Sequence, residues 1–417
     1  MSLANGRHYL AIPGPSVMPD RVLQAMHRAA PNIYTGELVE MVHGIVPDLK
    51  AVARTSTAQV AMYIANGHGA WEAAISNTMS RGDTILVLGT GRFCLGWGEM
   101  AATMGVNCQI IDFGTQSDID MAQVAEALEA DKSHQIKAVL AVQVDTSTSV
   151  KNDIAALRKT MDAANHPALL FSDNIACLAC DAFHMDDWGV DVMVTGSQKG
   201  LMTPPGMGFV YFSPKADAAR ENADLVTSYW DWRPRVNPDE FYRYFNGTAA
   251  THHLYGLRTA LDMIVHEEGV ETVWKRHSIL AQAIWSALEV WGQAGPIRPN
   301  IAEADKRSCA VTTVDFGTGN GQRLRDWMIA NAGVTLGIPL GGIRPEPEAA
   351  ADFLRIGHMG HVNAHMVLGV LGSLQAGMVA LDIPHGPTGL EAAAKVIADG
   401  SKAFLAGSIQ GKRQGCC

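Results

Sequence analysis

The chain has 417 residues, of which 47% are hydrophobic and 18% charged, and these proportions are typical of a folded enzyme and exclude a disordered or fibrous protein. The net charge is −10 and no basic run stands out, so we expect no nucleic-acid partner. No apolar stretch reaches the length of about 18 residues that spans a membrane, so we expect no membrane association. Seven scattered cysteines form no disulfide pattern and no signal-peptide pattern opens the chain, which predicts a cytoplasmic protein.

Residues 17–265 alternate helical patterns with short apolar runs, the pattern of successive βαβ units. Between the last two runs lie only about a dozen residues, too few for a crossover helix, so the final strand should run antiparallel. We therefore predict an α/β fold in which a mixed, mostly parallel sheet carries helices on both faces. The predicted strands are 84–88, 108–113, 136–144, 168–172, 190–195 and 207–212.

Residues 266–417 are predicted to form a smaller α+β domain, which follows a large domain at 17–265 and an N-terminal strap at 1–16. No repeat and no low-complexity linker separates these parts, so we expect the two domains to pack tightly. In the small domain we predict helices at 268–294, 361–381 and 390–407, and strands at 310–316, 334–338 and 353–356.

A lysine and an aspartate each follow a predicted strand. Lys199 comes just after the strand at 190–195, and ligands of open α/β sheets bind at the carboxyl ends of strands. Asp173 ends the preceding strand, so both side chains can meet above one sheet edge. A solvated loop lysine and a helix N-cap are the simpler readings of each residue alone. The pair, however, is what pyridoxal phosphate chemistry requires, because it offers an amine for a Schiff base and a carboxylate for the ring nitrogen.

A turn of small residues at 66–70 (Asn-Gly-His-Gly-Ala) opens a predicted helix. Its backbone N–H groups and the helix dipole would bind a cofactor phosphate, although such turns open many helices. A second glycine turn, 89–94, does not match the dinucleotide fingerprint, because Cys94 stands where the third glycine belongs.

Together these segments resemble the class V (fold type I) pyridoxal phosphate aminotransferases, and most closely the alanine, serine and aspartate–glyoxylate branch. The resemblance covers nearly the whole chain and is carried by 13–16 (Pro-Gly-Pro-Ser), 151–154 (Lys-Asn-Asp-Ile), 197–199 (Ser-Gln-Lys) and 355–360 (Arg-Ile-Gly-His-Met-Gly). It implies a transaminase that moves an amino group from alanine, serine or aspartate to a small 2-oxo acid such as glyoxylate or pyruvate. It also implies a homodimer whose active site is shared between subunits.

The resemblance assigns roles around pyridoxal 5'-phosphate. Lys199 would form the Schiff base and move the substrate proton, and Asp173 would pair with the ring nitrogen. Phe93 matches the aromatic ring that stacks on the cofactor, and Thr146 matches the hydroxyl that contacts its phenolic oxygen.

The phosphate and the substrate have further partners in the resemblance. Gly67, His68 and Gln198 match the phosphate cradle, which Thr248 reaches from the neighbouring subunit. Arg355 matches the residue that grips the substrate carboxylate, for which a planar guanidinium fork is suited, and Gly14 is placed beside the substrate with it.

The chain departs from the family at three places, and these departures concern the substrate more than the reaction. Ser149 stands where the family usually has glycine, and Thr248 is followed by alanine instead of proline. The segment 32–36 (Asn-Ile-Tyr-Thr-Gly) replaces the His-Arg pair of many serine and aspartate–glyoxylate enzymes.

Two related activities stay open. A pyridoxamine–pyruvate transaminase would carry an acidic residue where a phosphate would sit, and this chain has His68 there. A cysteine desulfurase usually has histidine before the lysine, where this chain has Gln198, and needs a mobile nucleophilic cysteine, whereas Cys309 lies in a strand-like run. A noncatalytic binding protein is a third reading, against which the joint presence of lysine, aspartate and arginine speaks.

We expect no metal site. Three histidines, His358, His361 and His365, are spaced like metal ligands, but no cluster of cysteines or carboxylates accompanies them. Cys177 and Cys180 form a single C-x-x-C spacing with no second pair, which favours buried packing over zinc or redox chemistry.

Overall fold

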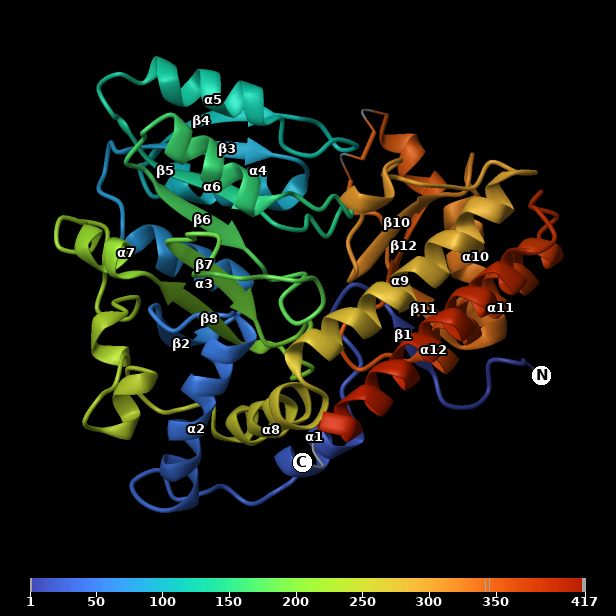
Figure 1. The fold of residues 1–417 in the computed structure, drawn as a ribbon, viewed down its shortest axis with the longest axis horizontal. Helices are drawn as coiled ribbons and strands as arrows, with labels where there is room; N and C mark the ends of the chain where they lie inside the picture. The colour runs from blue at the N-terminus through green and yellow to red at the C-terminus, as the bar shows by residue number, and fades with distance from the viewer. Residues whose placement is uncertain (1, 342, 345, 415–417) are drawn as a thin grey trace.

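A seven-stranded sheet forms the centre of the larger part of the molecule, at the left of Figure 1. The computed structural model describes residues 2–341, 343–344 and 346–414. The strand order is β2-β8-β7-β6-β5-β3-β4, and β8 runs antiparallel to both of its neighbours while the other pairs are parallel. The strands are β2 (Gln59–Ala65), β3 (Thr84–Gly89), β4 (Asn107–Asp112), β5 (Ile136–Val142), β6 (Leu169–Asp173), β7 (Val192–Gly196) and β8 (Gly206–Phe212).

The mixed sheet and the antiparallel last strand confirm the prediction, and all six predicted runs lie on strands. The sequence pattern did not predict β2, whose alanines and methionine favour helices as well as strands. β2 is an edge strand of the sheet and leaves Ile64 partly exposed. The pattern at this edge is therefore less distinctive than in the central strands.

Helices cover both faces of this sheet, which explains why its strands read as continuous apolar runs. Along β3, Ile85 and Val87 pack in a cluster with helices α3 and α4. Leu86 and Leu88 point to the other face and pack in a cluster with α2, α5 and α6. The helices of this part are α1 (Asp20–Met26), α2 (Glu37–Val52), α3 (Gly67–Ser76), α4 (Arg92–Thr103), α5 (Met121–Ala130), α6 (Ile154–Ala163), α7 (Pro214–Ala219) and α8 (Thr251–Leu261).

The C-terminal part has its own hydrophobic cluster, built from α9, α11, α12 and a small antiparallel sheet of order β12-β10-β9. A short π-helical segment, η3 (Asp262–Glu268), leads into α9, and α12 lies beside α9 at the right of Figure 1. The predicted helices and strands of this part are present. They are α9 (Val270–Gly292), β9 (Arg298–Pro299), β10 (Val311–Asp315), α10 (Asn320–Trp327), η5 (Met328–Ala332), β11 (Val334–Leu336), η6 (Pro347–Asp352), β12 (Phe353–Gly357), α11 (Ala364–Ala380) and α12 (Gly389–Gln414).

The N-terminal segment connects the two parts. β1 (Tyr9–Ala11) pairs in parallel with β11 of the C-terminal part. A few residues later, the N–H of Ser16 donates to the carbonyl of Gln198, and its hydroxyl donates to the carbonyl of Lys199 at 2.7 Å. The segment therefore runs from the small sheet to the loop that carries the lysine.

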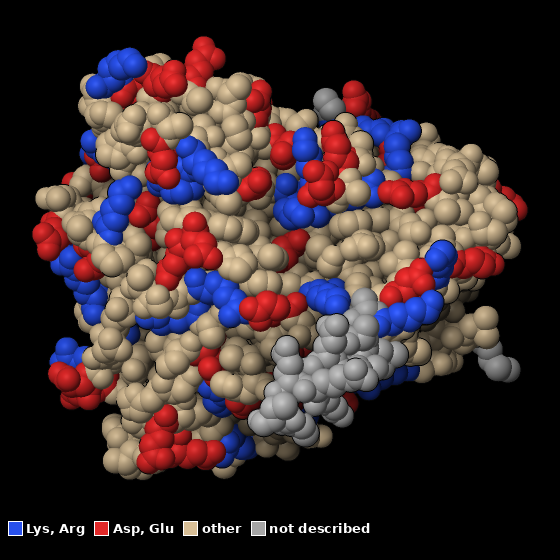
Figure 2. Space-filling view, in the orientation of Figure 1, with Lys and Arg blue, Asp and Glu red and all other residues tan. Residues whose placement is uncertain are grey.

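Acidic and basic side chains are interspersed on the face shown in Figure 2, with no large area of one sign. None of the helices in the described part of the chain combines the length and the apolar character needed to cross a bilayer.

Candidate active site

Asp173 and Lys199 meet at the carboxyl ends of two neighbouring parallel strands. β6 ends at Asp173, and Lys199 follows β7 after a short turn. Both residues line a cavity of about 240 Å³. The cavity also gathers most of the other residues predicted for the cofactor: Gly67, His68, Phe93, Thr146 and Gln198.

Asp173 is a buried carboxylate that accepts two hydrogen bonds. One oxygen accepts a hydrogen bond from the indole N–H of Trp71 at 2.8 Å, and the other accepts from the backbone N–H of Ile175 at 2.7 Å. Burial raises the pKa of Asp173 to about 7, although these two hydrogen bonds oppose the shift. A cationic ring nitrogen placed here would restore the charged form.

Lys199 is held by the N-terminal segment. Its ammonium donates to the carbonyl of Pro13, and a side chain at Gly14 would place its Cβ 2.5 Å from the lysine nitrogen. Burial, and then the charge of Arg355, lower the pKa of Lys199 to about 8. A sizeable share of the amine is therefore neutral near physiological pH, as a nucleophile or base requires.

The predicted phosphate cradle lies at the N-terminus of α3. Asn66 caps this helix by accepting from the N–H of Gly69 at 3.2 Å, and a Cβ on Gly67 would lie 2.3 Å from Ile175. Beside it, the buried side-chain oxygen of Gln198 has no hydrogen-bond partner in the part of the chain that is described. Free backbone N–H groups and an unused amide suit an anion here.

His68 is exposed and lies against Trp71, with the ring centroids 4.5 Å apart. Partial desolvation, and then the charge of Arg92, lower the pKa of His68. The ring is therefore neutral at pH 7 and can still donate one hydrogen bond to a phosphate oxygen.

Phe93, at the start of α4, and Thr146, on the loop after β5, both line the cavity. Phe93 is the second residue of α4 and packs edge-on against Trp71 at 6.2 Å. Its backbone N–H donates to Asp145 at 2.8 Å, which ties the start of α4 to the segment that carries Thr146. The aromatic face and the hydroxyl thus border the same space.

Arg355 reaches this region from β12 of the C-terminal part. Its Nε donates to the carbonyl of Ile338 at 2.7 Å, and Nη1 donates to the carbonyl of Thr146 at 2.9 Å. Burial lowers the pKa of Arg355 to about 10, so it stays charged at neutral pH. Two carbonyl bonds fix the guanidinium plane and leave its remaining N–H groups for a carboxylate.

Thr248 lies apart from the cavity of its own chain. It is exposed and precedes α8, and it does not line the space that holds Lys199. The role assigned to it in a neighbouring subunit stays a prediction.

Sequence reasoning did not single out Trp71 or Asp145 as site residues. Trp71 binds Asp173, and its position one turn into the helix after a glycine turn was the available signal. Asp145 binds the backbone of Phe93, and its signal was the hydroxyl-rich segment that it begins.

The three spaced histidines do not come together as metal ligands. His358 is buried and joined to Thr312 and to the carbonyl of Cys309. Within residues 2–341, 343–344 and 346–414, the group that meets the spacing of a metal site is Asp48, Asp262 and His266. In this group Arg258 already binds both aspartates.

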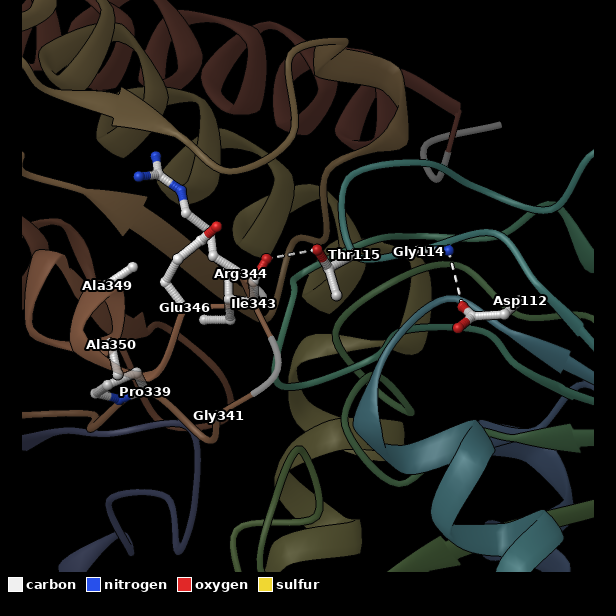
Figure 3. A pocket seen from close by; sticks show the side chains of 10 residues that line it. All are labelled: Asp112, Gly114, Thr115, Pro339, Gly341, Ile343, Arg344, Glu346, Ala349 and Ala350. Carbon is white, nitrogen blue, oxygen red and sulfur yellow. Dashed lines mark hydrogen bonds between the residues drawn. The ribbon is translucent and has the colours of Figure 1, made fainter.

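A groove leads outward from the cavity. A hollow of about 650 Å³ shares His68, Trp71 and Phe93 with the cavity and continues past the loop at 339–341. Beyond it, Figure 3 shows a second hollow of about 550 Å³, where the Thr115 hydroxyl donates to the carbonyl of Ile343 at 2.7 Å. The groove is lined by residues of both parts of the molecule.

Comparison with known proteins places the chain in a family. Residues 8–336 match the model of the family Aminotransferase class-V. The chain belongs to the class V aminotransferases. It is 33% identical over 383 residues to a serine–glyoxylate aminotransferase of Arabidopsis thaliana, with 91% of this chain and 92% of that one covered. It is 34% identical over 377 residues to an L-aspartate–glyoxylate aminotransferase of Paracoccus denitrificans, with coverage of 89% and 91%.

A solved structure shares the fold of this class V aminotransferase. The crystal structure of pyridoxamine-pyruvate aminotransferase from Mesorhizobium loti superposes with a TM-score of 0.82 and 25% identity, and covers 94% of this chain and 97% of that one. The family and the fold inferred from the residues are thereby confirmed. The family implies pyridoxal phosphate as cofactor.

Proposed function

We propose that this aminotransferase binds pyridoxal 5'-phosphate in the 240 Å³ cavity and moves an amino group from alanine, serine or aspartate to a small 2-oxo acid such as glyoxylate or pyruvate. The observation that carries the proposal is that Lys199 and Asp173 line one cavity and have opposite pKa shifts. The named activities of the two glyoxylate-linked relatives support this choice of substrates.

The residues of the cavity suit this cofactor. Gly67, His68 and Gln198 would hold its phosphate, together with Thr248 of the partner subunit. Phe93 would pack on its ring, and Thr146 would meet its phenolic oxygen. When bound, the cofactor supplies an electrophilic carbonyl and an electron sink.

Three side chains carry the chemistry that the protein itself supplies. Asp173, surrounded by nonpolar groups and two donors, keeps a proton on the ring nitrogen. Lys199, once its amine is free, would take the proton from the substrate α-carbon and donate it to the C4′ carbon of the cofactor. A pKa of about 8 suits both steps, because the amine can gain and lose a proton near neutral pH. Arg355 holds the substrate carboxylate and so orients the α-carbon toward the lysine.

Trapping with borohydride tests the proposal. Reduction of the purified protein should fix a cofactor adduct on Lys199, which peptide mass spectrometry locates. Lys199→Ala should lose the adduct and several orders of magnitude of turnover, because covalent attachment and proton transfer depend on one amine. The exposed Lys137→Ala is the matched control and should behave like the wild type. An adduct on another lysine would contradict the assignment.

A pyridoxamine–pyruvate transaminase is the second candidate, favoured by the solved structure described above. His68 stands where that activity would have an acidic residue, and the backbone N–H groups at the start of α3 can bind a phosphate, so both observations support a bound phosphate instead. Rates with a panel of amino donors against glyoxylate, pyruvate and oxaloacetate, with unphosphorylated pyridoxamine included, separate the two. Turnover of pyridoxamine as fast as any amino acid would reverse the preference.

We also infer a cytoplasmic homodimer. Cys94, Cys108, Cys177, Cys180 and Cys309 are free thiols, which suits a reducing compartment. The exposed Thr248 is available to a second subunit. Sedimentation equilibrium should give twice the mass of the chain.

A further inference from the structure

The segment 145–147 supplies the N-terminal cap that α4 does not supply for itself. The residue before α4 is Gly91, which has no side chain to accept from the first N–H groups of the helix. Instead, Arg92 N–H donates to the Ser147 hydroxyl at 3.2 Å, and Phe93 N–H donates to Asp145 at 2.8 Å. Gly91 lies so close that a Cβ would be 2.5 Å from the Asp145 carboxyl carbon.

Asp145 is a fully buried carboxylate that accepts from three groups. Besides Phe93 N–H, it accepts from the backbone N–H of Ser147 at 2.9 Å and from the Ser147 hydroxyl. Its exposed fraction is 0%. Burying a charge of this kind costs folding free energy. A neutral hydroxyl or amide could cap the helix at a smaller cost, so capping alone does not explain a carboxylate at this position.

The charge of Asp145 acts on both ends of the site. It opposes the burial that lowers the pKa of Arg355, and it adds to the burial that raises the pKa of Asp173. Arg355 in turn donates to the carbonyl of Thr146, the next residue of the same segment. The segment therefore holds the start of α4 on one side and the arginine on the other.

We propose that Asp145 is a positioning residue that fixes Phe93 and Arg355 to one segment and weakens the attraction of Arg355 for carboxylates. The proposal rests on the proposed function, in which Phe93 packs on the cofactor and Arg355 binds the substrate carboxylate. The negative charge of Asp145 would repel a substrate carboxylate bound at Arg355. This lets a product acid leave while Phe93 stays aligned.

The test compares Asp145→Asn, Asp145→Glu and Ser147→Ala in the cofactor-loaded enzyme. Propionate is the probe, because it offers a carboxylate and no amine. Asp145→Asn removes the charge, so the dissociation constant of propionate should fall by about threefold or more. The amide group must also turn an N–H toward one of three donors, so kcat should fall about tenfold.

Two variants separate charge from shape. Asp145→Glu keeps the charge and shifts the oxygens, so propionate should bind as in the wild type while kcat falls. Ser147→Ala loses a hydroxyl but no charge, so propionate affinity should again be unchanged. The visible absorbance of the bound cofactor should titrate at lower pH in Asp145→Asn than in the other proteins, because a nearby negative charge is gone.

Unchanged propionate affinity and an unchanged absorbance titration in a folded Asp145→Asn protein would overturn the proposal. If that variant does not fold, the smaller neutral Asp145→Ser takes its place with the same expected signs. A wild-type protein that shows no borohydride adduct on Lys199 overturns the proposed function, and the role of Asp145 with it. An active wild type with insensitive neutral variants overturns the role of Asp145 alone.

Discussion

The chemistry of single residues in this site is set mainly by burial, which disfavours the charge on both Asp173 and Lys199. The pKa of Asp173 rises to about 7 and that of Lys199 falls to about 8. An acid whose folded pKa lies above its unfolded value stabilises the fold at low pH and loses that contribution as the pH rises. In the protein without cofactor, the charged carboxylate of Asp173 therefore lowers the free energy of unfolding at neutral pH, although the cofactor requires that carboxylate.

Asp173→Asn should abolish the activity of the cofactor-loaded enzyme and stabilise the cofactor-free protein. The carboxylate costs nothing below its unfolded pKa near 4 and an increasing amount up to about pH 7, whereas the amide does not titrate. The melting temperature of the variant relative to the wild type should therefore rise between pH 5 and pH 7.5, and the half-reaction should be lost. Asp153→Asn, at the exposed N-cap of α6, is the control. A difference that is constant with pH would contradict the shift.

Arg355→Lys tests the carboxylate role directly. Lysine keeps the charge but loses the planar fork that Ile338 and Thr146 hold in place, so propionate should bind about tenfold more weakly. Cofactor affinity, measured by titrating the apoprotein, should not change. Parallel losses of both affinities would point to a disturbed contact between the two parts of the molecule.

The cavity residues that the sequence predicted are those whose residue type the cofactor chemistry requires. Lys199 and Asp173 stand at strand ends, and a glycine turn opens α3. Trp71 and Asp145 were not predicted, because a tryptophan in a helix and an aspartate after a strand have common structural roles. Only the pairing of distant segments shows that they bind Asp173 and Phe93.

At the scale of elements, apolar periodicity located most strands and helices, but neither the strand order nor β2 followed from it. β2 lies at the sheet edge, paired with β8, which is the last strand of this sheet along the chain. That pairing depends on contacts far apart in sequence, and no local pattern encodes it. The domain limits after residues 16 and 265 stay a prediction.

The N-terminal segment crosses β12 in close contact, and Gly357 permits this contact because it has no side chain. A Cβ at Gly357 would lie 2.1 Å from the carbonyl of Ile12. Gly357→Ala should therefore displace the segment that carries Pro13 and Gly14, cost about 1 to 3 kcal/mol of unfolding free energy and lower activity. Gly369→Ala on α11 meets open space and should be neutral or stabilising by up to about 1 kcal/mol. Urea unfolding of both variants measures the difference, and equal effects would contradict the close contact.

At the scale of the whole molecule, two buried histidines link segments of the C-terminal part that are far apart in the chain. His277 in α9 donates to the carbonyl of Val273 and accepts from the N–H of Gly360 at 3.0 Å. His358, just after β12, bonds to the carbonyl of Cys309 and to Thr312. His277 uses one nitrogen as donor and the other as acceptor, which only the neutral ring can do. Burial disfavours the charged form of His358 as well.

The neutral histidines predict a loss of stability in mild acid. Burial lowers the pKa of His277 to about 3 and that of His358 to about 4, against an ordinary value near 6.5. The unfolded chain therefore binds more protons below pH 6.5, and each histidine lowers the free energy of unfolding by about 1.4 kcal/mol per pH unit as the pH falls toward its folded pKa.

Buried acids such as Asp173 have the opposite effect on the free energy of unfolding, so the test compares the pH slopes of variants with that of the wild type. The slope of unfolding free energy against pH from 4.5 to 6 should drop by about one proton in His277→Gln or His358→Gln, whatever their absolute stability. The exposed His134→Gln should keep the wild-type slope, and identical slopes in all four proteins would show that these histidines are charged in the fold.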